Sequence, residues 1–341
     1  MSGTSLDGLD LAYAEFIPEL DAWKMQHIIA ETFSYTDEFR QWLNETMQCS
    51  GSELIERHIK FGKYLGKSAL EFIQKHQLQP QLIASHGHTI FHQPEHGYTF
   101  QLGHGSGIRA ITGIETVWDF RTLDVLLGGQ GAPLVPIGDR LLFGSYHACL
   151  NLGGISNISF EFNDQRIAFD ISPFNLVLNW LSQKLGLEFD PDGNYASKGK
   201  LNNHLLQSLN HLEFYKKTPP RSIGKEWIDR NVLPLFETYP DTTENHLHTF
   251  TVHAAIQISE ILKKYNISKL LVTGGGTYNR FFMNQLKSMN RAEVVIPDDT
   301  TIQFKEALIF GLLGVLRIRK EINILASVTG ATSNSSGGCI S

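Results

Sequence analysis

Apolar residues along this chain recur at two spacings, one typical of strands and the other typical of helices. Short apolar runs predict strands over residues 11–16, 82–85, 115–118, 149–152, 158–162, 167–169 and 269–272. A helical spacing predicts helices over residues 37–76, 108–112, 175–185, 249–265 and 306–318. Because strands and helices alternate, the pattern predicts an α/β protein with mixed sheets flanked by helices.

Three segments outside the predicted strands and helices carry signals of their own. The Gly- and Pro-containing sequence between Gly87 and Gly107 predicts polar turns. Asn163-Asp164 separates two strand-like runs and predicts a tight hairpin. The tail Ser327–Ser341 is rich in Ser, Gly, Thr and Asn, and we expect part of it to be loosely ordered.

The chain has 341 residues, 42% of them hydrophobic, so it can bury a sizeable core. This length favours two lobes over one. The turn-rich region at residues 143–150 is the expected boundary, which gives an N-terminal lobe over residues 1–145 and a C-terminal lobe over residues 146–341.

Charge and cysteine content exclude several classes of function. The formal net charge is -6 with no basic block, which argues against a nucleic-acid partner or an anionic membrane surface. The longest apolar run, residues 307–316, is half the length of a membrane span, and no signal segment opens the chain, so we expect a cytoplasmic protein. The three cysteines are far apart, which fits neither a disulfide framework nor a thiolate metal site.

Glycine-rich turns accompany three of the predicted strands. They contain Gly3 with Gly8, Gly153-Gly154, and Gly274–Gly276. Glycines at strand ends let backbone N–H groups reach phosphate oxygens, because ligands of α/β sheets bind at these ends. One such turn is ordinary turn chemistry. Three of them predict a nucleotide held between two lobes.

The first ten residues, MSGTSLDGLD, add donors and charge to the first turn. Gly3 and Gly8 can take positive φ, and Thr4 and Ser5 offer N–H and O–H donors. Asp7 and Asp10 can hold a cation. This segment is therefore a candidate phosphate loop.

Carboxylates supply the second ingredient of phosphoryl transfer, a group that orients or deprotonates the nucleophile. Asp170 is the candidate base because it closes a predicted strand; the alternative is that it caps the next helix or braces the turn. Asp119, Arg121 and Asp124 either bind a sugar or a carboxylate, or form a surface ion-pair cluster. Glu306 precedes an apolar helix, where its alternative function is to stabilise the helix N-terminus.

Two further motifs each allow more than one interpretation. His86, His88, His92 and His96 lie within eleven residues, and they either line a cleft, bind a metal or are ordinary loop residues. The Gly and Pro between them break the register that would bring their imidazoles together, which argues against the metal. The segment 219–226, PPRSIGKE, either closes over a substrate or links two helices.

Six blocks together resemble the anhydro-N-acetylmuramic acid kinase family, which is related to the hexokinase, heat-shock-70 and actin ATPase group. They lie in family order over nearly the whole chain: MSGTSLDGLD (1–10), SHGHT (85–89), DFRTLDVLLGGQGAPLVP (119–136), NLGGISNIS (151–159), PPRSIGKE (219–226) and TGGGTYN (273–279). The resemblance implies two ribonuclease-H-like, actin-like ATPase lobes with ATP in the cleft between them. It also implies that water opens the 1,6-anhydro bond of the sugar while O6 takes the γ-phosphoryl group, giving N-acetylmuramic acid 6-phosphate and ADP.

The resemblance also implies a function for individual residues. Asp170 would be the base that activates water. The residues near the sugar would be Arg121, Asp124 and Glu306. ATP would be bound by Gly3, Thr4, Ser5, Leu6, Asp7, Gly8, Leu9, Asp10, Gly153, Gly154, Gly274, Gly275 and Gly276.

The implied cofactors and partners are few. Mg²⁺ would bridge the phosphates of ATP without a metal site of the protein's own. The partners would be the amino sugar and ATP, with no nucleic acid or membrane, and a homodimer is compatible with the family. The expected context is cytoplasmic peptidoglycan recycling.

Two departures from the family pattern lead to different expectations. Family chains have a short strand before the Met of the first motif, which here is Met1, so the first hairpin should lack an inner hydrogen-bond partner, as a shortened start would produce. The family form FDTGPGN reads FDISPFN at residues 169–175, so Ser172 and Phe174 should narrow any close backbone approach. These departures motivate two alternatives, a kinase for another anhydrosugar and a catalytically weak sugar- or nucleotide-binding protein.

Overall fold

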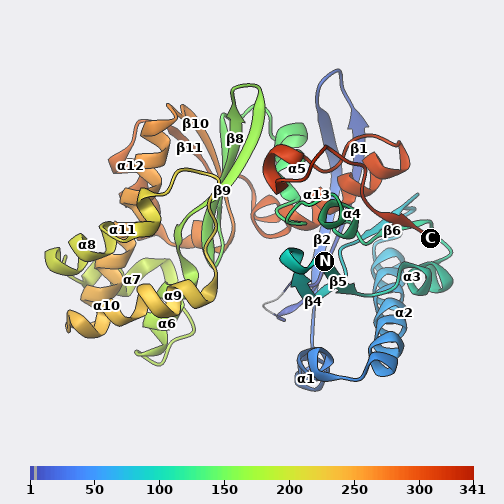
Figure 1. Cartoon of the computed structure of the whole chain (residues 1–341), viewed down its shortest axis with the longest axis horizontal. Helices are drawn as coiled ribbons and strands as arrows, with labels where there is room; N and C mark the ends of the chain where they lie inside the picture. Colours follow the sequence, from blue (N-terminus) through green and yellow to red (C-terminus); the bar gives the residue numbers. More distant parts are fainter. Residues whose placement is uncertain (4–5) are drawn as a thin grey trace. The chain divides into compact units, whose positions relative to one another are not determined.

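The computed structural model describes residues 1–3 and 6–341 and divides into two compact units (Figure 1). Unit 1 comprises Met1–Gly144 and Phe304–Ser341, and unit 2 comprises Ser145–Gln303. The chain thus returns to the first unit for its last segment, which differs from the expected lobe running from residue 146 to the end. The reason is the apolar face of the last long helix, which packs into the core of unit 1.

Unit 2 is built on a five-stranded mixed sheet with the order β11-β10-β7-β8-β9. Its strands are β7 (Ala148–Leu152), β8 (Ile155–Phe162), β9 (Gln165–Pro173), β10 (Lys269–Thr273) and β11 (Glu293–Val295). Only β8 runs opposite to the other four. This is the strand order of a ribonuclease-H-like lobe and confirms the predicted mixed α/β class.

Helices of unit 2 gather on one side of this sheet in Figure 1. They are α6 (Asn175–Gln183), α7 (Asn194–Lys198), α8 (Asn203–Asn210), α9 (Lys225–Asn231), α10 (Leu233–Thr238), α11 (Thr243–Lys264) and α12 (Arg280–Met289). The long helix α11 is buried over most of its length and contacts α6, α7, α8, α12 and β9. A helix that is buried on most of its sides forms the centre of a core rather than a surface layer.

Unit 1 contains shorter sheets. A long hairpin joins β1 (Gly8–Pro18) to β2 (Trp23–Ser34), and a second hairpin joins β4 (His88–Gln93) to β5 (Tyr98–Leu102). A third sheet has the order β12-β6-β3, with β3 (Ile83–Ser85) parallel to β6 (Thr116–Trp118) and β12 (Cys339–Ile340) antiparallel to it. Among the described residues, β1 pairs with β2 and otherwise makes one isolated bridge, from Leu9 to Ser2, which also bridges to His88.

The helices of unit 1 are α1 (Asp37–Glu45), α2 (Gly51–Lys75), α3 (Gly105–Thr112), α4 (Thr122–Leu126), α5 (Val135–Leu142), α14 (Ala326–Thr329) and most of α13 (Asp299–Ile318). Close approach at two glycines lets α13 cover strands of this unit. A Cβ on Gly311 would lie 3.2 Å from the ring of Phe16, and one on Gly314 would lie 2.7 Å from Cβ of Ala84. The same helix therefore packs against β1 and β3.

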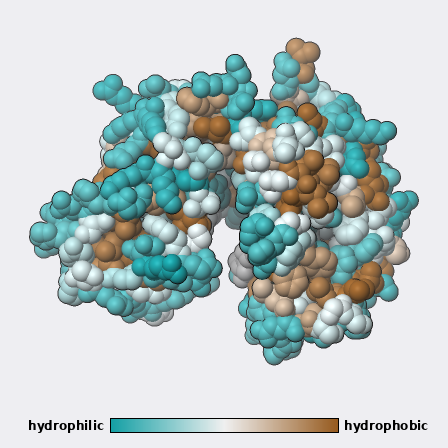
Figure 2. Space-filling view, viewed as in Figure 1, coloured by the Kyte–Doolittle hydropathy of each residue, from teal (hydrophilic) through white to brown (hydrophobic). Residues whose placement is uncertain are grey.

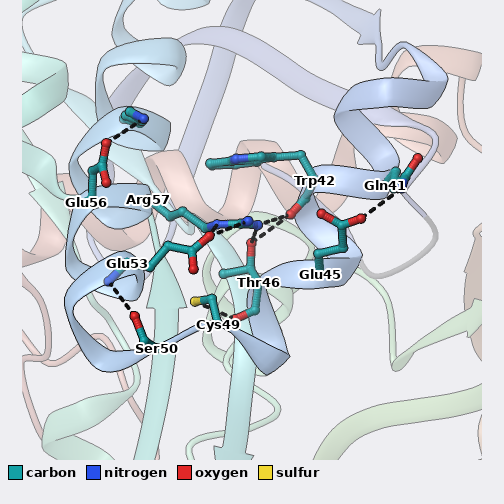
Figure 3. A network of polar contacts seen from close by, with 10 residues as sticks. Gln41, Trp42, Glu45, Thr46, Cys49, Ser50, Glu53, Glu56 and Arg57 are labelled. Atoms are coloured by element: carbon teal, nitrogen blue, oxygen red, sulfur yellow. Dashed lines mark hydrogen bonds and ion pairs between the residues drawn. The ribbon is translucent and has the colours of Figure 1, made fainter.

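A polar network ties α1 to α2 (Figure 3). The guanidinium of Arg57 donates to Glu53 on its own helix and, at 2.6 Å, to the carbonyl of Trp42 at the end of α1. It also donates to Oγ1 of Thr46 and lies 5.1 Å from the centre of the Trp42 ring. The bond to Trp42 satisfies a carbonyl near the end of α1, where helix carbonyls lack partners within the helix.

The structure confirms most of the predicted elements and adds several that were not predicted, including α7, α8, α12 and β11. Other differences from the prediction have an identifiable cause. The strand β2 and the hairpin β4–β5 were not predicted, because polar side chains interrupt their apolar alternation. The tail is held by the pairing of β12 with β6 and by a bond from Nε of Arg317 to the carbonyl of Gly338 at 2.7 Å, so it is not loosely ordered. Helix α13 starts at Asp299, about two turns earlier than predicted.

Figure 2 shows hydrophilic residues over much of one face, with apolar residues scattered among them. Individual exposed apolar side chains such as Leu20 and Leu126 are ordinary for a protein surface. In the part of the chain that the structure describes, no helix is long and apolar enough to cross a membrane.

Candidate active site

Two of the three glycine turns lie side by side in unit 2. The parallel strands β7 and β10 are neighbours, and Asn151 pairs with Thr273 at their carboxyl ends. Gly153-Gly154 and Gly274–Gly276 follow directly, as the sequence predicted. The amide of Asn175, at the start of α6, donates 3.2 Å to the carbonyl of Gly153. Two glycine turns and a helix N-terminus therefore meet at the carboxyl ends of β7 and β10, an arrangement suited to an anion.

The glycines of the second turn are required for different reasons. Gly274 has φ of +86°, which favours glycine. A Cβ on Gly276 would lie 2.3 Å from Cε1 of Phe174, so this glycine permits the close packing of the turn on a buried ring. Gly275 is exposed, and a Cβ there would meet only Nδ2 of Asn175, at 3.9 Å. The backbone of Gly275 is thus accessible from solvent.

Asp170 lies on β9, an edge strand of the sheet, at a break in its pairing with β8. Asn157 pairs with Asp170 and Ser156 pairs with Ser172, so Ile171 is an extra residue and forms a β-bulge. Bulges bend a strand and redirect the side chains beside them, often next to active sites. The carboxylate Oδ2 accepts the amide of Ile223 at 2.8 Å.

This environment favours proton uptake by Asp170. Burial raises its pKa to about 6, opposed by the hydrogen bond from Ile223 and by the nearby charge of Arg221. A carboxylate with a pKa near the working pH suits a general base. The alternative interpretation as a helix cap is not what the structure shows, because residue 174 occupies the N-cap position of α6.

The first glycine turn is described only in part. Thr4 and Ser5 lie outside the described residues. The amide of Leu6 donates 3.3 Å to the carbonyl of Gly3, and Leu6 itself has φ of +59°, an uncommon conformation for a residue with a side chain. Gly8 lies within β1 without positive φ; glycine is needed there because a Cβ would lie 2.6 Å from the carbonyl oxygen of Phe33 on β2.

The other residues of the first motif have distinct surroundings. Asp10 is half-buried on β1, and its Oδ1 accepts the hydroxyl of Thr32 at 2.6 Å. Leu9 is buried in a core cluster of unit 1, and Asp7 is exposed, with its carbonyl accepting the amide of Tyr35 at 3.4 Å. Leu9 is therefore a packing residue, whereas Asp7 and Asp10 keep accessible carboxylates.

A cationic centre in unit 1 forms around Arg121. Its Nε and Nη2 donate to Nε2 of His86 at 3.1 and 2.8 Å, and its Nη1 donates to the carbonyl of Gly131 at 2.6 Å. The other ring nitrogen of His86 lies 3.1 Å from the carbonyl of Gly87, so it carries the proton and leaves Nε2 as the acceptor. Burial and Arg121 lower the pKa of His86 well below its usual value, which keeps the ring neutral.

Glu306 belongs to the same centre. It lies within α13, two turns after the helix begins, so the expectation that it stabilises a helix N-terminus is wrong. Its side chain is accessible to solvent, yet the surrounding protein removes much of the bulk water and this desolvation raises its pKa, with Arg121 opposing the rise. An accessible carboxylate beside a half-buried guanidinium offers both an acceptor and donors to a polar ligand.

Asp124 holds the loop that follows it. Its side chain is fully buried; Oδ2 accepts the amide of Gly131 at 2.7 Å and Oδ1 accepts the hydroxyl of Thr329 at 2.7 Å. The interpretation of this region as a surface ion-pair cluster is therefore excluded. Because Gly131 also accepts from Arg121, Asp124 fixes the loop that orients the guanidinium.

The remaining histidines of the SHGHT region do not converge, and those with hydrogen bonds have different partners. Nδ1 of His88 lies 3.0 Å from Oγ of Ser2, Nδ1 of His92 lies 3.0 Å from Oγ1 of Thr99, and His96 is exposed. Across residues 1–3 and 6–341, no group of three His, Cys, Asp or Glu side chains is arranged to hold a metal ion.

The two residues that replace glycines of the family form in the FDISPFN block, Ser172 and Phe174, are buried in the core. Ser172 is fully buried, and its hydroxyl donates to the carbonyl of Pro173 at 2.9 Å and lies 3.3 Å from the hydroxyl of Tyr215. Phe174 is also fully buried and contacts Phe282 edge to face, with ring centres 4.6 Å apart. Neither side chain covers the surface of the glycine turns, contrary to the expectation that they narrow the approach.

Sequence reasoning missed the contacts of Asp170 with Arg221 and Ile223, and that of Arg121 with His86. Both partners were visible as motifs, PPRSIGKE and SHGHT, but neither motif indicates where its loop returns in space. The structure thus groups the predicted residues in two sets: Asp170 and two glycine turns in unit 2, and Arg121, Asp124, Glu306 and the first motif in unit 1.

Comparison with known proteins shows one family over the whole chain. The family described as anhydro-N-acetylmuramic acid kinase matches residues 1–341. Proteins with that name in Haemophilus influenzae and Pasteurella multocida are 32% and 34% identical to this chain, covering all of it and 96% and 95% of their own lengths. A third, from Acinetobacter baylyi, is 33% identical over 97% of this chain and 95% of its own. The chain therefore belongs to the anhydro-N-acetylmuramic acid kinase family.

Proposed function

We propose that this protein is an ATP-dependent kinase that hydrolytically opens 1,6-anhydro-N-acetylmuramic acid and phosphorylates O6. Its family is one of phosphotransferases. The observation that carries the proposal is Asp170, a bulged edge-strand carboxylate whose pKa is raised to about 6. Such a group is ionised at neutral pH and basic enough to take a proton from water.

The proposed reaction balances as follows. Water forms a bond to the anomeric carbon and gives its proton to Asp170, while the bond from that carbon to O6 breaks. O6 forms a bond to the γ-phosphorus as the bond to the β-phosphate oxygen breaks. The products are N-acetylmuramic acid 6-phosphate, ADP and one proton.

The glycine turns supply binding for ATP in this proposal. The exposed backbone of Gly275 offers an N–H group to a nucleotide, and the N-terminus of α6 beside it adds a favourable dipole, although its own first amides already donate to the carbonyls of Gly153 and Gly154. By resemblance to the family, we assign the first motif, residues 1–10, to ATP as well. Because ATP is the phosphoryl donor, we place the reaction in the cytoplasm.

Mg²⁺ fits the residues that are present. Oδ1 of Asp10 is oriented by Thr32, which leaves the other carboxylate oxygen for a hydrated ion, and Asp7 is exposed nearby in sequence. Mg²⁺ keeps several waters and takes few protein ligands when it is held by phosphates, so a cluster of three is not needed. When bound, the ion neutralises charge on the transferred group.

The centre around Arg121 is suited to the sugar. Its guanidinium is fixed by His86 and by the carbonyl of Gly131, so binding loses little side-chain entropy. Arg121 could pair with the carboxylate of the lactyl group, and Glu306 could accept hydroxyl or amide protons. In this proposal Asp124 acts on the sugar through the loop that it holds.

The experiment is to incubate the protein with Mg-ATP and the anhydro sugar and to follow ADP and the sugar product by mass. We expect a product heavier than the substrate by one phosphoryl group and one water, absent with Asp170→Asn. Asp229→Asn is the matched control, because Asp229 is an exposed carboxylate on α9 of the same unit.

Three other results would count against the proposal. Phosphorylation without the added water would remove Asp170 as the water-activating base. Turnover of a different anhydrosugar alone would make this a kinase of other specificity. Binding of sugar or nucleotide without turnover would make it a binding protein that has kept the fold.

A further inference from the structure

We propose that Arg221 is a positioning residue for Asp170, and that the segment from Phe214 to Ile223 holds the carboxylate in place for proton transfer. The inference rests on the proposed function of Asp170 as the base. It assigns the PPRSIGKE motif to the base itself, rather than to closure over a substrate or to a link between helices.

The segment covers the free edge of β9 at Asp170. The amide of Asp170 donates 3.0 Å to the carbonyl of Arg221, and Nε of Arg221 donates 3.1 Å to the carbonyl of Asp170. Two residues further on, the amide of Ile223 donates 2.8 Å to the carboxylate. Backbone and side chain of one short segment therefore satisfy the amide, the carbonyl and one carboxylate oxygen of Asp170.

The guanidinium of Arg221 also organises its own segment. Nη1 lies within hydrogen-bond distance of three carbonyls, those of Phe214, Tyr215 and Lys217, at 3.3, 3.2 and 3.1 Å. The group lies 4.7 Å from the ring centre of Phe214 and 5.8 Å from that of Phe169. A planar guanidinium can stack on rings while donating in its plane, which an ammonium cannot do.

A buried network anchors the other end of the segment. The hydroxyl of Tyr215 lies 2.8 Å from Nε2 of His253 on α11, and Nδ1 of His253 lies 2.6 Å from Oδ1 of Asn210. The same hydroxyl lies 3.3 Å from that of Ser172, two residues after Asp170. The segment is thus attached both to the strand that carries the base and to the central helix of the unit.

Charge acts alongside geometry. Arg221 faces Asp170 and lowers its pKa, in opposition to burial, while Tyr215 and Tyr265 face Arg221 itself. Burial raises the pKa of Tyr215, so it stays neutral. Removing the guanidinium should therefore have two effects: it should raise the pKa of Asp170, and it should make the position of the carboxylate less fixed.

The test compares Arg221→Met with Arg230→Met, which removes one positive charge from an exposed site on α9. We expect Arg221→Met to lower kcat about tenfold to hundredfold with little change in KM for ATP, because small misplacements of a base are costly. The acid limb of the kcat/KM profile should move up by about one pH unit. Arg230→Met should match the wild type in both.

A second readout does not need activity. The carboxyl carbon of Asp170, labelled with ¹³C and assigned with Asp170→Asn, reports its pKa directly by NMR titration. An upward shift in Arg221→Met supports the proposal even if the wild type proves inactive on the tested sugar, in which case the proposed function alone fails. Identical titrations in Arg221→Met, Arg230→Met and the wild type overturn the positioning proposal.

Arg221→Lys covers the case in which the methionine variant does not fold. Lysine keeps the charge but cannot reach the carbonyl of Asp170 and those of the segment at once. We expect the kcat of Arg221→Lys to lie between those of the wild type and Arg221→Met. If Arg221→Met does not fold, the expected result is a kcat about threefold below that of the wild type. The acid limb of the kcat/KM profile should stay at the pH of the wild type, because lysine keeps the charge. A kcat equal to that of the wild type in Arg221→Lys would overturn the assignment.

Discussion

Two adjacent glycines in the turn after β10 provide a matched pair for testing the structure. Alanine at residue 276 places its Cβ 2.3 Å from Cε1 of Phe174 and 2.8 Å from Cβ of Leu152. Alanine at residue 275 meets only Nδ2 of Asn175, at the ordinary distance of 3.9 Å. The two substitutions are chemically identical and differ only in what surrounds the new methyl group.

The expected magnitudes follow from packing. Carbon atoms in contact lie about 3.5–4.0 Å apart, so Phe174 must move by more than about 1 Å in Gly276→Ala. Phe174 is fully buried against Phe282 and has no open space to enter. We expect a loss at the upper end of the usual 1–3 kcal/mol for overpacking, or about 4–10 °C in Tm. Gly275→Ala should be between neutral and about 1 kcal/mol stabilising, because it restricts the unfolded chain.

Thermal unfolding and ATP saturation curves of both variants measure the two effects separately. The Tm of Gly276→Ala should be lower than that of the wild type, whereas the Tm of Gly275→Ala should be unchanged or slightly higher. Gly275→Ala should also raise KM for ATP, because its methyl group occupies the surface predicted to meet the nucleotide. Equal Tm values for the two variants would refute the packing argument. An unchanged KM in Gly275→Ala would count against nucleotide binding at this turn.

Further predictions concern titration, the cationic centre and the metal. The kcat/KM of the wild type should fall as pH drops through about 6, because Asp170 takes up a proton there; a flat profile in that range would contradict its function as the base. The pKa of His253 is lowered to about 3 by burial, whereas the unfolded value is near 6.5, so the unfolded state binds more protons below pH 6.5. Stability should therefore fall as pH drops from about 6.5 toward 3, with a shallower slope in His253→Gln by urea unfolding. His86→Leu removes the acceptor for two N–H groups of Arg121 and should cost about 1–3 kcal/mol and raise KM for the sugar, with a smaller effect of His86→Gln. EDTA should abolish turnover and excess Mg²⁺ should restore it, and turnover in EDTA would contradict the dependence on the metal.

Local signals were sufficient for much of the fold. Strand runs such as residues 149–152 and 269–272 and the turn at Asn163-Asp164, with φ of 50° and 60°, depend on the period of neighbouring side chains and on short-range turn geometry. The same holds for the position of two glycine turns directly after strands. The order of the family motifs along the chain likewise needs no structure to be read.

Contacts between residues that are distant in the sequence could not be predicted from the pattern of apolar and polar residues. The hairpin β4–β5 combines polar side chains such as His92 and Gln93 with buried ones, and the buried Ile90 and Leu102 pack against core residues from elsewhere in unit 1. Glu306 was assigned to a helix start because the apolar run begins beside it, whereas polar residues from Asp299 onward extend the helix. The last segment joins unit 1 because α13 covers β1 and β3, which no local rule predicts.

The sequence by itself determined the α/β class, the family and the residue types of the candidate site, because these follow from periodicity and from short motifs. Only the tertiary structure decided the surroundings of those residues. Burial in a bulged strand sets the pKa of Asp170, and a segment some fifty residues away holds it. The neutral state of His86 and the buried position of Asp124 depend in the same way on distant partners. Desolvation and hydrogen bonding are properties of the folded surroundings, so the identity of a residue cannot specify them.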